Sequence, residues 1–156
     1  MISLTGEYEC KMDDRGRVKL PQKLIEMLGN KRSFEFIVNR GFEKNLIIYP
    51  KEVWEEKTKE INQLNIYDKK QREVIRYFYR GATEMSNDSA DRILMPKHLS
   101  SYAGIKKDVV LFAYLNFIEV WSKENYQEMI QREPEDFSSL VEGVFNQPPT
   151  SNSEDV

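Results

Sequence analysis

Cysteine and histidine are almost missing from this chain, since each occurs once in 156 residues, as Cys10 and His98. A single cysteine excludes an internal disulfide and a zinc site built from several cysteines, and it fits a reducing compartment. Because Cys10 lies in an alternating, strand-like segment, we interpret it as a small hydrophobic residue of the core. His98 has no paired ligand nearby, so we expect a surface or half-buried side chain.

Long apolar runs are also missing. The segment VVLFAYL at 109–115 is among the longest, and it falls far short of the roughly 20 residues that span a bilayer. The N-terminus lacks the basic region and apolar stretch of a secretory signal. We therefore expect neither secretion nor a membrane partner. With 40% apolar and 12% aromatic residues, the chain suits one compact domain or two small related ones.

Sequence motifs of catalysis are absent too. The chain has no phosphate-cradling glycine loop, no nucleophile elbow and no carboxylates at metal-binding spacing. Ser100 and Ser101 lie near His98, but sequence neighbours do not make a catalytic site. Trp54 and Trp121 are typical of core or interface anchors. We predict a protein that is not an enzyme and that uses no cofactor, metal or small-molecule substrate.

Charge is distributed unevenly along the chain. The formal net charge of −3 argues weakly against indiscriminate binding to polyanions. Residues 11–32 contain seven basic and three acidic residues, a balance of +4, whereas residues 131–156 contain one basic and six acidic residues, a balance of −5. A basic segment and an acidic tail are thus separate features, and the last residues, NQPPTSNSEDV, have so little to bury that we expect disorder.

The strongest signal is an internal repeat at an offset of 75 residues. The segments MDDRGRVKLP at 12–21 and NDSADRILMP at 87–96 share Asp, three residues, Arg, an apolar-rich stretch and Pro. Eight identical pairs align at this one offset: Gly6 and Gly81, Glu9 and Glu84, Asp13 and Asp88, Arg17 and Arg92, Pro21 and Pro96, Leu24 and Leu99, Gly29 and Gly104, Lys31 and Lys106. Such regularity indicates a tandem duplication.

Each copy predicts the same order of elements. A strand at 6–12 or 81–87 is followed by a turn, a short strand, a short helix between Pro and Gly, and a hairpin rich in branched and aromatic residues. Two amphipathic helices join the copies, the second capped by Asp68 and bringing Val74, Ile75 and Phe78 to one side. A further helix is expected at about 123–131, and the apolar patch FSSLVEGVF follows it.

Neither copy has many core residues of its own, so we expect the two halves to pack on each other around a pseudo-twofold axis. The resulting fold class is α+β. We place a first repeat at 1–54, a helical linker at 55–79, a second repeat at 80–131 and an acidic, largely disordered tail at 132–156.

The paired motifs, with GEYECKMDDRGRVKLPQKL first and DRILMPKHLSSYAGIKKDVVL second, resemble the MraZ family over about residues 1–130. This resemblance implies two AbrB-like (SpoVT-AbrB) halves of the double-split β-barrel type. It also implies a bacterial cytoplasmic, nucleoid-associated transcription factor that assembles into a ring homo-oligomer. Such proteins bind short direct repeats in double-stranded promoter DNA of the division and cell-wall gene cluster that holds their own gene.

The resemblance also implies residue roles. Asp13 and Arg17 form the first motif and Asp88 and Arg92 the second, while Arg15 occupies a commonly basic position beside Gly16. The second copy departs from this pattern, since Ala90 and Asp91 stand where the first has Arg15 and Gly16. Asp tolerates a left-handed turn, but the missing positive charge leads us to expect that the first copy does most of the binding.

Group chemistry gives these residues their expected tasks. A guanidinium can hold a phosphate or the O6 and N7 edge of guanine, and lysines suit backbone phosphates. We predict DNA contacts by Arg15, Arg17, Lys19, Lys11 and Arg92, with Lys23 as a further phosphate ligand. We predict structural roles in the motif for Asp13, Gly16, Asp88 and Asp91. For Arg17 and Arg92, pairing with the aspartate and contacting DNA both stay open.

Two functional hypotheses follow. The first is a ring-forming DNA-binding regulator, favoured by the duplicated motif and its basic turn. The alternative is an antitoxin-like or other protein-interaction module of the AbrB-like group, whose acidic tail could wrap a basic partner. Such antitoxins usually carry one copy and a longer acidic tail, so the duplication favours the regulator.

Overall fold

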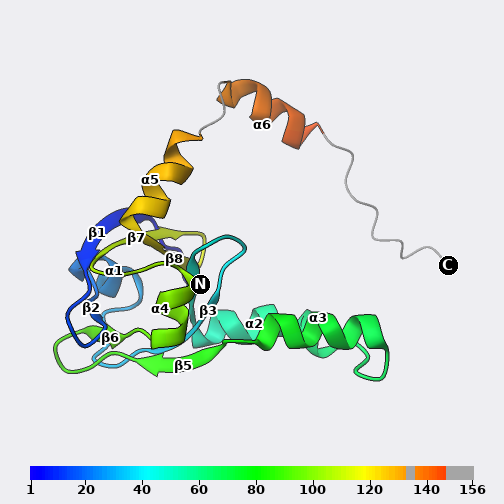
Figure 1. Cartoon of the computed structure of the whole chain (residues 1–156), viewed down its shortest axis with the longest axis horizontal. Coiled ribbons are helices and arrows are strands. Elements are labelled where there is room, and N and C mark those ends of the chain that lie inside the picture. The colour runs from blue at the N-terminus through cyan, green and yellow to red at the C-terminus, as the bar shows by residue number, and fades with distance from the viewer. Residues whose placement is uncertain (133–135, 147–156) are drawn as a thin grey trace. The chain divides into compact units, whose positions relative to one another are not determined.

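The computed structural model describes residues 1–132 and 136–146, and it divides into a compact unit of residues 1–126 and a second unit from residue 127 onward. The strands are β1 Gly6–Lys11, β2 Arg17–Lys19, β3 Glu35–Arg40, β4 Leu46–Pro50, β5 Thr83–Ser86, β6 Arg92–Leu94, β7 Asp108–Tyr114 and β8 Phe117–Ser122 (Figure 1). The helices are α1 Gln22–Met27, α2 Lys51–Asn62, α3 Lys69–Tyr79, α4 Lys97–Tyr102, α5 Lys123–Gln131 and α6 Phe137–Phe145. The predicted α+β class is confirmed.

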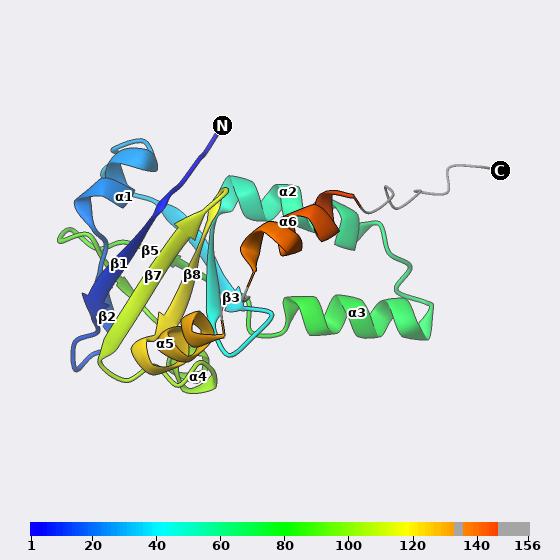
Figure 2. The same ribbon diagram turned by 90° about the horizontal axis from the view of Figure 1, so that it is seen from above.

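Six strands form one sheet in the order β1-β7-β8-β4-β3-β5, and all its pairings are antiparallel. Figure 2 shows β1, β7 and β8 side by side in this sheet. Exchanging the two halves of the chain turns this order into its own reverse, because β1, β3 and β4 correspond to β5, β7 and β8. The outer strand of each half pairs with the other half, β1 with β7 and β5 with β3. The halves are therefore interleaved, and neither contains its complete set of strand partners.

The remaining strands, β2 and β6, form a separate two-stranded antiparallel ribbon between the halves. Val18 lies opposite Ile93 at its centre, and both side chains are fully buried. Single bridges from Met12 to Val18 and from Asn87 to Ile93 connect the ribbon to the ends of β1 and β5. The ribbon thus covers the main core with its inner face and leaves its outer face open.

The large sheet is apolar on both faces, and strand alternation divides the residues between them. On β4, Leu46 and Ile48 join the main core with residues of α1, α4 and the ribbon, whereas Ile47 and Tyr49 face the other way. The predicted helix starts are confirmed, since Pro21 and Pro96 directly precede α1 and α4. Gly29 and Gly104, with φ of +109° and +68°, follow the helix ends as expected.

Aromatic side chains cover the second face of the sheet. Trp54 of α2 stacks on Phe78 of α3, with ring centroids 5.3 Å apart, and also packs against Tyr49. Glu119 accepts hydrogen bonds there from the Tyr114 hydroxyl (2.8 Å) and Trp121 Nε1 (3.0 Å). Burial first, and then this bond to Glu119, raise the pKa of Tyr114. Trp121 is buried and Trp54 half-buried, as expected of anchors.

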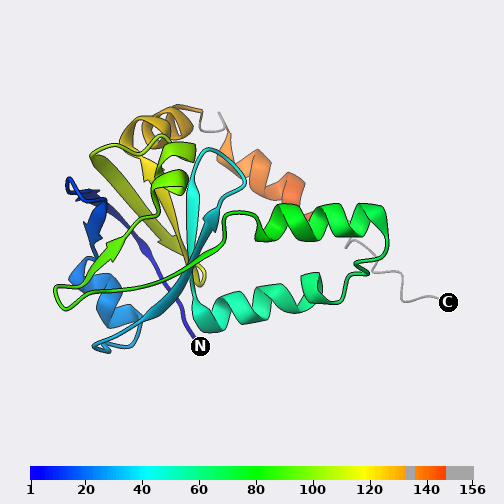
Figure 3. The same cartoon turned by 60° about the horizontal axis from the view of Figure 1, so that its bottom comes forward.

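Helices α2 and α3 form an arm that extends away from the sheet (Figure 3). The predicted cap of α3 is confirmed, because Asp68 Oδ2 accepts the Gln71 backbone N–H at 3.0 Å. Val74, Ile75 and Phe78, expected on one side of α3, differ in exposure, since Val74 is 50% exposed whereas Ile75 and Phe78 are half-buried. Phe78 faces Trp54, and Val74 lies four residues earlier on the same helix.

The second repeat ends in α5, with the predicted bounds, and the chain continues as α6 over the apolar patch at 137–145. Tyr126, early in α5, is buried against Phe112 and Trp121. The disorder expected for the last residues falls on 147–156, which lie outside the described residues, as do 133–135. None of the helices in the described ranges is long and apolar enough to cross a membrane.

Candidate nucleic-acid interface

The first motif turn is organised by Asp13. Its Oδ1 accepts the backbone N–H groups of Arg15 (3.0 Å) and Arg17 (2.9 Å), and its Oδ2 accepts Arg17 Nε at 2.7 Å. These interactions, the Arg17 backbone N–H foremost, lower the pKa of Asp13. The aspartate therefore stays ionised and holds both the turn and the guanidinium in place.

The second motif turn repeats this geometry. Asp88 Oδ1 accepts the backbone N–H groups of Ala90 and Arg92, each at 2.9 Å, and its Oδ2 accepts Arg92 Nε at 2.8 Å. Its pKa is lowered in the same way, first by the Arg92 backbone N–H. Asp91 adopts a left-handed φ of +59° where Gly16 has +83°, so the replacement of glycine keeps the turn.

The outer face of the ribbon gathers three of the predicted cations. Lys19 lies directly opposite Arg92, and Arg17 opposite Leu94. Because Val18 and Ile93 between them point into the core, these four side chains project to the other side. Pairing of the two halves thus brings together Arg17, Lys19 and Arg92, which come from different repeats and share one exposed surface.

The other predicted contact residues lie on neighbouring segments of the chain. Arg15 is exposed at the tip of the first turn, and Lys11 is exposed at the end of β1, opposite Asp108. Lys23 is exposed on α1. Arg17 and Arg92 form ion pairs with Asp13 and Asp88, and each guanidinium uses its Nε atom for the pair. Among the described residues, none accepts a hydrogen bond from the terminal Nη atoms of Arg17 or Arg92.

Beside the first turn is a hollow of about 550 Å³, which we call the motif hollow. Its lining contains three lysines of the second half, Lys97 on α4 and Lys106 and Lys107 in the loop before β7. The residues of the motif hollow are Met12, Asp13, Asp14, Arg15, Gly16, Met95, Lys97, Ser100, Ser101, Ile105, Lys106 and Lys107.

Sequence reasoning missed these three lysines because they belong to the other repeat and lie far from the turn along the chain. Backbone bonds across the ribbon bring the halves together there, since Gly16 O accepts the Met95 N–H at 2.9 Å and Asp91 O accepts the Leu20 N–H at 2.8 Å. The repeat could have indicated two of them, because Lys106 and Lys107 occupy the positions of the basic residues Lys31 and Arg32 in the first copy.

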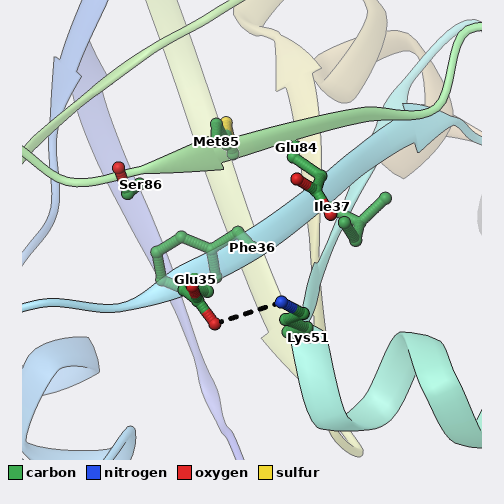
Figure 4. Close-up of a pocket in the computed structure, with 7 residues that line it drawn as sticks. All are labelled: Glu35, Phe36, Ile37, Lys51, Glu84, Met85 and Ser86. Carbon is green, nitrogen blue, oxygen red and sulfur yellow. Dashed lines mark ion pairs between the residues drawn. The ribbon is translucent and has the colours of Figure 1, made fainter.

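Another hollow, of about 190 Å³, lies between β3, β5 and the start of α2 (Figure 4). Its rim carries the carboxylates of Glu35 and Glu84, and Lys51 Nζ pairs with Glu35 at 3.4 Å. This acidic edge does not suit a polyanion.

Elsewhere, burial raises the pKa of the half-buried Cys10 thiol to about 11, and His98 is exposed on α4. The described residues contain no cluster of three His, Cys, Asp or Glu side chains that could hold a metal ion.

These features define a class of two-repeat α+β proteins, in which duplicated Asp-x-x-x-Arg turns flank a solvent-exposed cationic ribbon. The family model described as "MraZ protein, putative antitoxin-like" matches the chain twice, over residues 3–77 and 78–146. The chain belongs to the MraZ family.

Similar proteins cover nearly the whole chain. The transcriptional regulator MraZ of Christiangramia forsetii is 37% identical over 146 residues, 93% of this chain and 94% of the relative. Its counterpart in Flavobacterium psychrophilum is 36% identical over 146 residues, 93% of each chain. The transcriptional regulator MraZ of Clostridium beijerinckii is 36% identical over 137 residues, 88% of this chain and 93% of the relative. The resemblance found in the paired motifs is thereby confirmed.

Proposed function

We propose that this protein is a sequence-specific DNA-binding transcriptional regulator that contacts double-stranded DNA with the outer face of the β2–β6 ribbon and the adjoining first turn. The observation that carries the proposal is the row of Arg17, Lys19 and Arg92 on that face, next to exposed Arg15. A two-stranded ribbon fits the major groove of B-DNA, and arginine can reach guanine edges or phosphates from it. The names of the relatives, transcriptional regulator MraZ, support the same role.

In this proposal the two turns contribute unequally. The first carries Arg15 and Gly16, while the second carries Ala90 and the acidic Asp91. Asp13 and Asp88 act as positioning residues, because each fixes its turn and holds the arginine four residues later. The local excess of cations at the first turn allows binding to DNA despite a formal net charge of −3.

We further propose that the DNA target is a set of short direct repeats in the promoter of the division and cell-wall gene cluster, bound by a ring-shaped homo-oligomer. One subunit offers few cations, but a ring repeats the same surface at a fixed spacing, and tethered sites multiply affinity when the DNA repeats match that spacing. The interleaved halves support assignment to the AbrB-like double-split β-barrel type. The proposed location is the cytoplasm, in association with the nucleoid.

The test is a salt series of promoter-DNA binding for the wild type and Arg15→Ala. Counterion release gives a linear fall of log affinity with log salt, with a slope near −0.9 for each neutralised phosphate. We expect the Arg15→Ala slope to be shallower by about one unit for each phosphate that an engaged subunit no longer neutralises. Lys70→Ala, on α3 in the arm, is the matched control and should keep the wild-type slope. Unchanged affinity and slope for Arg15→Ala would remove Arg15 from the interface.

The words "antitoxin-like" in the family description support a second candidate, a protein-interaction module. This candidate predicts no salt-dependent affinity for promoter DNA. It predicts instead that a basic protein partner binds the acidic residues from 132 onward. Truncation after residue 131 separates the two, because it should abolish partner binding in the second case and leave the DNA slope unchanged in the first.

A further inference from the structure

The motif hollow has a charge suited to an anion. Four cations contribute to its lining, namely Arg15, Lys97, Lys106 and Lys107, and all four are exposed. Two carboxylates also line it, but Asp13 is paired with Arg17 at 2.7 Å. Asp14 is then the one lining carboxylate without an ion-pair partner among the described residues. The remaining charge of the hollow is positive.

A buried hydroxyl in the same wall lacks a hydrogen-bond partner. Ser100 is 7% exposed, and its Oγ is enclosed without an acceptor or donor among the described residues. A buried polar group in this state is a cost to folding unless something satisfies it. In the first repeat the equivalent residue is Ile25, which is 4% exposed and packs in the main core. Packing therefore does not call for a hydroxyl at this position, whereas a phosphate oxygen in the hollow would supply the acceptor that it lacks.

The surroundings of the second turn are different in charge. At the positions equivalent to Arg15, Lys97 and Ser101, that turn has Ala90, Gln22 and Glu26. Two cations are absent there and one carboxylate is added. The pair Lys106 and Lys107 does have a counterpart, Lys31 and Arg32, which provides a natural control.

Resting on the proposed function, we propose that the motif hollow is a phosphate-binding site, and that it receives a backbone phosphate of the DNA that lies along the ribbon. Lys97, Lys106 and Lys107 supply the charge, and the Ser100 hydroxyl donates a hydrogen bond to a phosphate oxygen. The volume of about 550 Å³ accommodates a phosphate with its sugar. The second half of the chain thereby contributes to DNA binding through its helix α4 and the loop before β7, in addition to Arg92 on the ribbon.

The experiment measures duplex-DNA affinity across a salt series for four proteins. These are the wild type, the double variant Lys106→Ala/Lys107→Ala, the control Lys31→Ala/Arg32→Ala, and Ser100→Ala. The first double variant should have a salt slope shallower by about one unit per engaged subunit and bind roughly tenfold more weakly per subunit at about 0.1 M salt. The control should keep the wild-type slope. Ser100→Ala should weaken binding severalfold at unchanged slope and an unchanged or higher melting temperature, because it removes an unpartnered hydroxyl.

Each other outcome has a distinct meaning. If the wild type binds DNA and both double variants keep its slope, or reduce it equally, the hollow is not a phosphate site, although the proposed function stands. If the wild type does not bind DNA, the proposed function fails, and inorganic phosphate becomes the probe. If phosphate changes the amide chemical shifts around Ser100 and Lys106 in the wild type, and this change is lost in Lys106→Ala/Lys107→Ala, the hollow is a site for a free phosphate group. No such change in the wild type would overturn the site altogether.

Discussion

Gly16 and Asp91 occupy equivalent places in the two motif turns, and both have left-handed φ angles, +83° and +59°. The left-handed region costs most residues roughly 1–2 kcal/mol. Glycine does not have this cost, and for Asp and Asn it is smaller. A Cβ on Gly16 would meet Met95 O at 3.6 Å, which is ordinary contact. Backbone conformation, and not space, therefore restricts this position.

We predict that Gly16→Ala lowers the free energy of unfolding by about 1 kcal/mol and that Gly16→Asn lowers it by less. Denaturant unfolding of both variants measures the difference. Asn is the matched control because it adds a longer side chain than Ala while tolerating positive φ. Equal decreases for the two variants would mean that contacts, and not φ, decide the residue here.

Asp13 and Asp88 give the fold a defined response to acid. The folded state lowers the pKa of both carboxyl groups, chiefly through backbone N–H groups of Arg17 and Arg92. Their contribution to stability is therefore complete above the unfolded-state pKa of about 3.9 and is lost as the pH falls through the lower folded-state values.

We predict that Asp13→Asn/Asp88→Asn is less stable than the wild type at neutral pH and that the difference shrinks steadily below about pH 4. Thermal unfolding from about pH 2 to about pH 7 measures it. Asp14→Asn, at an exposed neighbour, is the control and should follow the wild-type curve. Parallel curves for the double variant and the wild type would show that the carboxylates do not stabilise the turns.

The β2–β6 ribbon combines a core side and a solvent-exposed side within three residues of each strand. Ile93 and Val18 are fully buried at its centre, whereas Leu94 is 58% exposed. We predict that Ile93→Ala lowers the free energy of unfolding by about 2–5 kcal/mol, because it opens a cavity where the two halves meet. Leu94→Ala should stay within about 0.5 kcal/mol of the wild type. Denaturant titrations of both variants measure the contrast, which a small effect of Ile93→Ala would contradict.

Local patterns predicted most of the elements, because Pro21, Gly29, Asp68 and the alternation in the strands act on their own neighbours in sequence. The pairing of β1 with β7 and of β5 with β3 could not be predicted in this way. Two similar repeats carry the same strand pattern, so the sequence does not distinguish pairing within a half from pairing between halves. Which pairing forms depends on how the side chains of both halves pack in one core.

The same distinction applies to the candidate interface. The contact between Asp13 and Arg17 spans four residues of one turn, so the motif spacing was sufficient to give it as one of the two roles left open for Arg17. Lys106 and Lys107 reach the first turn through the pairing of β1 with β7, where Lys107 O accepts the Met12 N–H at 2.7 Å. Lys97 follows β6, which pairs with β2, so both contacts join residues far apart in sequence. Periodicity placed Val74 and Phe78 on one side of α3, but it does not show how much of that side a neighbouring element covers.

Taken as one molecule, the chain leaves apolar side chains on the arm in solvent. Tyr67 is 90% exposed and Val74 50%, and Ile66 and Tyr77 are also more than half exposed. Such a group of exposed apolar residues on one projecting element is typical of a surface that contacts another protein. In the proposed ring, the arm of one subunit would bury these residues against its neighbour.

We therefore predict that light scattering gives a mass more than twice the 18.5 kDa of one chain, and that Tyr67→Ser/Val74→Glu reduces it. DNA affinity of this variant should fall about a hundredfold or more, because separated subunits no longer gain from tethering although every residue of the ribbon is intact. Lys69→Gln, an exposed polar change on the same helix, is the control and should leave both mass and affinity unchanged. A monomeric wild type would defeat the ring, and a variant with full mass would move the subunit interface off the arm. A variant of reduced mass that still bound DNA with full affinity would show that one subunit is sufficient, and the explanation by many weak interactions acting together would then have to be given up.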